Sequence, residues 1–134
     1  MLAPAVTGIR LTLHVLAATI WVGGQLTVAG LLPTVRSLGG EAPRLVARAL
    51  GRLLWPAYAV LLATGIWNVF AMGVRGHPQS WWVILWVKIG VVVLAGVSAA
   101  LHSIAKSRAG LAVWGALAVA SSLAALALGV FLSG

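Results

Sequence analysis

The sequence predicts an all-α integral membrane protein, an antiparallel bundle of four transmembrane helices with both termini on the outer side. Three observations support this prediction: the composition, the long apolar segments, and the placement of the basic residues. Of the 134 residues, 62% are hydrophobic and 7% are charged, whereas an ordinary soluble domain has roughly 25% charged residues. Four apolar segments are each long enough for a hydrocarbon core of about 30 Å, which needs about 20 residues. They occupy nearly the whole chain, so we expect one transmembrane domain over residues 1–134.

The basic residues predict the orientation of the chain in the membrane. The net charge of +8 comes from nine Lys and Arg residues against one acid. Most of the basic residues flank the first and third connections: Arg36, Arg44, Arg48, Arg52, Lys106 and Arg108. By the positive-inside rule these two connections are cytoplasmic. We therefore expect a multi-pass protein of the plasma membrane whose partner is the lipid bilayer rather than nucleic acid. Because cysteine is absent, disulfides and thiolate metal sites are excluded.

The first two helices are expected over residues 6–34 and 44–72. The inner half of the first contains three glycines, which predict close packing because small residues let membrane helices approach: Gly23, Gly24 and Gly30. Within the second helix, Pro56 removes a backbone hydrogen bond and predicts a kink. Thr64 and Asn68 lie one turn apart as its buried polar pair. They predict a hydrogen bond to a neighbouring helix.

The third and fourth helices are expected over residues 81–104 and 111–132. The third opens with an aromatic belt of the kind found at membrane interfaces: Trp81, Trp82 and Trp86. The fourth has no charged residue and is rich in alanine, glycine and serine. Its Ala118 and Ser122 have the four-residue spacing of small residues at helix contacts, which predicts a packing helix.

A polar stripe on the first helix is the best candidate site. At about 100° per residue, one face of this helix brings together a titratable ring, an indole, an amide and a basic residue: Arg10, His14, Ala18, Trp21 and Gln25. Such groups are expensive in a membrane and mark functional sites. We expect this stripe to bind a cofactor.

Depth in the membrane relates the stripe to the third helix. His14 and Lys88 both lie roughly 10 to 12 Å below the outer ends of their helices, at about 1.5 Å per residue. His102 lies about 20 Å deeper than Lys88 by the same rise, so it is excluded as a second axial ligand beside His14. A buried cation needs compensation. Either His14 is neutral in the bundle and Lys88 extends to the outer interface, or an anionic ligand lies between the two helices.

Haem b is one such ligand, with His14 coordinating the iron while Lys88 and Arg10 meet the propionates. Copper is the alternative cofactor, with His14 and possible transient ligands His77, Met72 and Met1. Soft Cu(I) sites, however, favour Cys and Met beside imidazole. A third hypothesis is a non-catalytic accessory subunit of a larger membrane complex, or a homo-oligomer, joined through tryptophans and small-residue faces.

Short segments in three of the helices are similar to a known superfamily. Residues 13–24, with His14 and Trp21, resemble the CopD-like copper-resistance membrane domain and the related HemJ-type protoporphyrinogen oxidases. Residues 52–57 with 63–65 resemble the second helix of these families. Residues 86–88, which end in Lys88, resemble the third together with His102.

The resemblance implies a site and an activity. In the HemJ-type family the first-helix histidine and third-helix lysine are the functional pair, which implies these roles for His14 and Lys88. That family binds haem b and oxidises protoporphyrinogen IX, so an oxidoreductase is implied. Residues 22–25 are closer to the CopD pattern, which implies copper transport or resistance instead.

Overall fold

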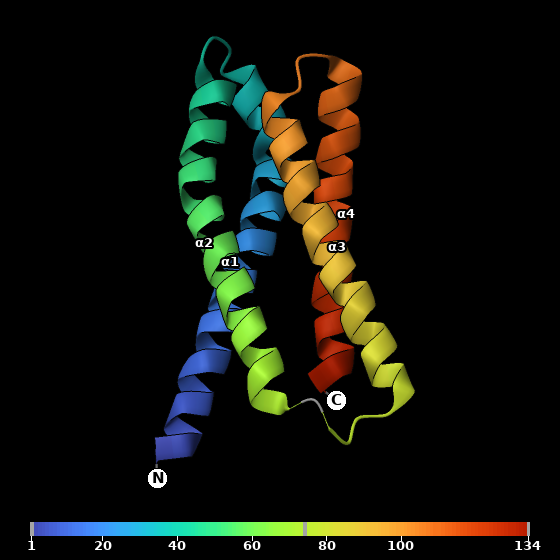
Figure 1. The fold of residues 1–134 in the computed structure, drawn as a ribbon. Coiled ribbons are helices and arrows are strands. Elements are labelled where there is room, and N and C mark those ends of the chain that lie inside the picture. The colour runs from blue at the N-terminus through green and yellow to red at the C-terminus, as the bar shows by residue number, and fades with distance from the viewer. Residues whose placement is uncertain (1, 74, 134) are drawn as a thin grey trace. The chain divides into compact units, whose positions relative to one another are not determined.

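The computed structural model describes residues 2–73 and 75–133, and nearly all of them lie in four α-helices (Figure 1). The helices are α1 (Leu2–Ser37), α2 (Ala42–Met72), α3 (Gln79–Ile104) and α4 (Arg108–Ser133). All four are long and apolar enough to cross a membrane. The all-α fold with four spanning helices is therefore confirmed. Met1, named above as a copper ligand, lies outside the described residues.

The helices extend beyond the apolar segments from which they were predicted. α1 begins four residues earlier than expected and ends three residues later. α4 begins at Arg108 rather than at residue 111. The Ser107 hydroxyl accepts a hydrogen bond of 3.0 Å from the Gly110 backbone N–H, which caps the first turn. Polar ends continue a helix because its backbone bonds do not depend on apolar side chains, so hydropathy marks the span rather than the helix terminus.

The chain divides into two compact units, Met1–Val74 and Arg75–Gly134. Each unit is a helical hairpin, α1 with α2 in the first and α3 with α4 in the second. In each hairpin we call the end beside the short link between its helices the connection end, and the opposite end the open end.

One face of α1 is buried along most of its length. The buried residues Arg10, Ala17 and Trp21 follow one another at intervals of seven and four, which is the pattern of a helix packed along one stripe. Val22 and Val35 are buried as well. His14, Ala18 and Gln25 are half-buried beside them. The polar stripe predicted from the sequence thus lies on the sheltered face of α1.

Gly24 is the point of close approach between α1 and α2. A Cβ atom at Gly24 would lie 2.7 Å from Leu54 Cδ2, whereas one at Gly23 or Gly30 would have no neighbour within 4 Å. Of the three glycines predicted to permit close packing, Gly24 is therefore the one that does so here.

Small residues occupy the buried faces of the second hairpin. They include the predicted pair, of which Ala118 is 4% and Ser122 is 2% exposed. The full set of small buried residues on the two helices is Ala95, Gly96, Ser98, Ala118, Ser121 and Ser122. Small side chains let two helices approach closely without an apolar driving force, so α4 acts as a packing helix, as predicted.

Candidate functional site in the first hairpin

His14 is held in place by the second helix. Its Nδ1 lies 2.8 Å from Thr64 Oγ1, which confirms the predicted hydrogen bond between Thr64 and a neighbouring helix. The single hydroxyl hydrogen of Thr64 is donated to the Val60 carbonyl oxygen at 2.7 Å. With this hydrogen on Val60, the hydroxyl oxygen can only accept from His14, which assigns the proton of the imidazole to Nδ1. In this tautomer the lone pair of the neutral imidazole lies on Nε2, the nitrogen that a metal ion would use.

A glycine lies directly against the imidazole ring. A Cβ atom at Gly65 would be 3.5 Å from Cε1 of His14, which is ordinary van der Waals contact. The ring therefore rests against the backbone of α2, with Thr64 fixing one of its nitrogens. Thr64 was identified from the sequence by its polarity. Gly65 was missed, because nothing in the sequence distinguishes a glycine that contacts a histidine from any other glycine.

Arg10 lies one turn from His14 toward the open end, on the same face of α1. It is 7% exposed, and its Nε is buried without a hydrogen-bond partner among the described residues. The one acid of the chain is Glu41, which pairs with Arg44 at 3.5 Å on the exposed surface near the connection. Arg10 is thus a buried cation that this acid does not neutralise.

Asn68 occupies the corresponding place on α2, one turn from Thr64 toward the open end. Its Oδ1 is also buried without a hydrogen-bond partner among the described residues. Sequence reasoning paired Asn68 with Thr64 as two helix-to-helix donors or acceptors. In the structure Thr64 makes such a bond and the Asn68 carbonyl oxygen does not.

Trp21 forms an aromatic cluster closer to the connection end. Its ring is 2% exposed and lies 4.6 Å from the ring of Tyr58 and 5.7 Å from that of Trp55, centroid to centroid. Gln25 donates a hydrogen bond of 3.0 Å from Nε2 to the Trp21 carbonyl oxygen. Trp21 follows His14 by about 10 Å along α1 at 1.5 Å per residue. Trp21 and Gln25, both predicted site residues, therefore make packing and hydrogen-bond contacts on the connection side of His14.

Lys88 belongs to the second hairpin, where it lies against α4. A Cβ atom at Gly129 would be 3.0 Å from Lys88 Nζ, so the absence of a side chain there makes room for the ammonium group. His102 follows the same arrangement, because a Cβ atom at Gly115 would be 3.0 Å from its ring. Its Nδ1 donates to the Leu111 carbonyl oxygen at 2.8 Å. His102 therefore joins the two helices near their connection.

The alternative copper ligands lie in aromatic or exposed surroundings. His77 stacks on Trp81 with a centroid distance of 4.0 Å and an interplanar angle of 14°. Met72 is 44% exposed at the end of α2. Within residues 2–73 and 75–133, no three His, Cys, Asp or Glu side chains lie together as a metal-binding group. A metal ion at His14 would therefore need its other ligands from a cofactor, from solvent or from a partner.

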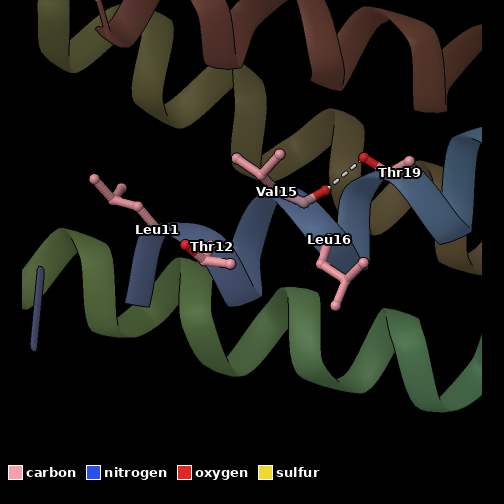
Figure 2. A pocket seen from close by; sticks show the side chains of 5 residues that line it. All are labelled: Leu11, Thr12, Val15, Leu16 and Thr19. Atoms are coloured by element: carbon pink, nitrogen blue, oxygen red, sulfur yellow. Dashed lines mark hydrogen bonds between the residues drawn. The ribbon is translucent and has the colours of Figure 1, made fainter. Parts of the chain in front are cut away.

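An open hollow lies on the opposite face of α1 from the polar stripe. Figure 2 shows the five side chains that line it, all from α1, with the Thr19 hydroxyl bonded to the Val15 carbonyl oxygen at 2.8 Å. The lining residues are all exposed: Leu11, Thr12, Val15, Leu16 and Thr19. Because this hollow contains no charged or metal-ligating side chain, the candidate site is the buried face instead.

Comparisons with protein-family models, with curated proteins and with solved structures gave no significant match to this chain.

Proposed function

We propose that this protein binds haem b in the outer half of the plasma membrane and has a redox function. His14 is the axial ligand in this proposal, and Arg10 of the same hairpin is the charge partner of the propionates. The function is electron transfer or, as the resemblance implies, oxidation of protoporphyrinogen. Bound haem would supply an iron that changes its oxidation state by one electron at a potential set by its ligands.

The observation that carries the proposal is the hydrogen bond between His14 and Thr64. Metal-ligating histidines usually donate their second ring N–H to a fixed acceptor, which sets the tautomer and the orientation of the ring. Thr64 is such an acceptor at 2.8 Å, and it is buried, with 4% of its surface exposed. Its own hydrogen is committed to the α2 backbone. This arrangement favours Nε2 of His14 as the coordinating atom.

The donor set favours haem over a bare metal ion. A porphyrin brings four nitrogen ligands of its own, so the protein needs to add only one or two. A single imidazole without other metal-ligating side chains around it is sufficient for haem and is a weak site for copper. The residues present therefore fit haem with one protein ligand at His14.

The buried cation of this hairpin fits the acidic groups of the same cofactor. Arg10 lies one turn from His14 and is buried, and its Nε has no hydrogen-bond partner in the part of the chain that the structure describes. A buried cation is costly unless an anion is near. Two carboxylates of a haem would supply that anion. In this proposal Arg10 holds the propionates by charge and takes no part in electron transfer.

An absorption spectrum of the protein purified in mild detergent tests the proposal. We expect a Soret band and about one haem per chain, measured by pyridine haemochrome assay and by iron and copper analysis. The variant His14→Ala should lose the band. His102→Ala is the matched control and should keep it, because Nδ1 of His102 is bonded to Leu111 in the other hairpin. Thr64→Val should retain haem but shift its reduction potential, since the acceptor that orients the ring is removed.

The opposite results would refute the proposal. A folded wild-type protein that is colourless after supplementation with haem precursors would exclude haem binding. Stoichiometric copper without haem would instead support copper handling by a CopD-like protein. A Soret band of equal intensity in His14→Ala and in wild type would exclude His14 as the ligand.

A further inference from the structure

Two buried polar atoms without partners lie at the same level of the first hairpin. They are Nε of Arg10, a donor, and Oδ1 of Asn68, an acceptor. The hydrogen bond between His14 and Thr64 sets the register of the two antiparallel helices. Arg10 lies four residues from His14 and Asn68 four residues from Thr64, both toward the open end, which is about 6 Å along each helix. The two side chains are therefore the next pair along this interface.

The helices also separate in the direction of this pair. Figure 1 shows the N-terminal end of α1 and the C-terminal end of α2 diverging toward the open end of the hairpin. Near the middle of α1, by contrast, Gly24 allows this helix to approach Leu54 closely. Arg10 lies in the N-terminal third of α1 and Asn68 in the last turns of α2, on the open-end side of the bond between His14 and Thr64.

Unbonded groups of this kind have a large energetic cost. A buried donor or acceptor without a partner has lost its hydrogen bonds to water, and the cost is larger when the group is charged. Glu41 pairs with Arg44 near the connection and does not supply the missing bonds. A guanidinium Nε–H binds an anionic oxygen best, and the Asn68 carbonyl oxygen requires an O–H or N–H group.

We propose that Arg10 and Asn68 form an oxyanion-binding site one turn outward from His14. The ligand group presents an anionic oxygen to Arg10, and an O–H group beside it, or a water bound to it, donates to Asn68. Two sources have this chemistry: the phosphate and glycerol hydroxyls of an anionic lipid headgroup, and the carboxylate of a cofactor. Asn68 is a new member of the site, and the lipid source does not depend on the proposed haem function.

Paired ligands with and without the anionic group test the site. In the lipid arm, native mass spectrometry compares retention of phosphatidylglycerol with that of diacylglycerol, which lacks the phosphate. In the cofactor arm, titration compares haem with haem dimethyl ester, which lacks free carboxylates. We expect wild type to prefer the anionic member of at least one pair about tenfold, the effect of one charge-assisted hydrogen bond. Arg10→Gln should abolish this preference, and Arg10→Lys should restore part of it. Asn68→Leu should weaken the binding of the anionic member.

Arg52→Gln is the matched control, because Arg52 is an exposed arginine near the connection end of the same hairpin. It should leave the preference unchanged, and circular dichroism melting should show that all variants are folded. Equal binding of both members in both pairs by wild type would overturn the site, as would an unchanged preference in Arg10→Gln. A colourless wild type that still prefers phosphatidylglycerol would refute haem binding and support this site. A wild type that binds haem but discriminates in neither pair would support haem binding and refute the oxyanion-binding site.

Discussion

The hydrogen bond between His14 and Thr64 should have a measurable coupling energy. Thr64→Val keeps the shape of the side chain while removing the acceptor that lies 2.8 Å from Nδ1 of His14. Thr64 is only 4% exposed, so water does not replace the lost acceptor. Loss of one partner of a buried bond costs about 1–3 kcal/mol, whereas hydrogen bonds between membrane helices average about 0.6 kcal/mol and reach about 1.7 kcal/mol. We expect a coupling energy of about 1 kcal/mol between the two side chains.

A double-mutant cycle separates this energy from other effects of each substitution. The cycle uses Thr64→Val, His14→Ala and the double variant, with unfolding measured in mixed micelles of mild and denaturing detergent. Thr19→Val is the control, because the Thr19 hydroxyl bonds only to the backbone of its own helix in the described contacts, at 2.8 Å from the Val15 carbonyl oxygen. It should change the free energy of unfolding by no more than about 0.5 kcal/mol. A coupling energy below about 0.3 kcal/mol, which is the usual error of additivity, would refute the assigned bond.

Two further predictions concern packing. Gly24→Ala should be less stable than Gly23→Ala by about 1 kcal/mol, the low end of overpacking costs, because its Cβ would lie 2.7 Å from Leu54 Cδ2 and the flexible end of that side chain must move. The adjacent Gly23→Ala, whose Cβ has no neighbour within 4 Å, should be neutral or stabilising. Leu54→Ala should rescue Gly24→Ala, because it removes the atom in contact. Equal effects of the two glycine substitutions on unfolding in detergent would contradict the close approach. Ser98 is 0% exposed, and its hydroxyl oxygen has no hydrogen-bond partner within the described residues. Ser98→Ala removes this unpaired polar group and should therefore raise the free energy of unfolding by about 1 kcal/mol. Ser121→Ala is the control, because the Ser121 hydroxyl bonds to the Leu117 carbonyl oxygen, and its removal should not stabilise the protein. A loss of stability in Ser98→Ala would contradict the prediction.

Much of the candidate site could be read from α1 alone. A period of 3.6 residues places Arg10, His14, Trp21 and Gln25 on one face, and the structure shelters that face. Sequence reasoning also expected a bond from Thr64 to another helix, because a polar side chain in a membrane needs a partner. What it could not identify was the partner, since the register between two helices depends on the turn and on side-chain packing. For the same reason Gly65 and Gly129 were missed as the contacts of His14 and Lys88.

The sequence by itself determined that the chain is helical and lies in a membrane, and where its four spans are. Hydropathy and length suffice for this because a backbone in hydrocarbon must satisfy its own hydrogen bonds, which a single helix does without any other part of the chain. Only the tertiary structure decided which polar groups in each hairpin are bonded and which are not. His14 and Thr64 meet, while Nε of Arg10 and Oδ1 of Asn68 remain without partners in the described part of the chain. Whether two side chains bond depends on the relative position of their helices to within about an ångström. The pattern of residues along one helix contains no information about that position.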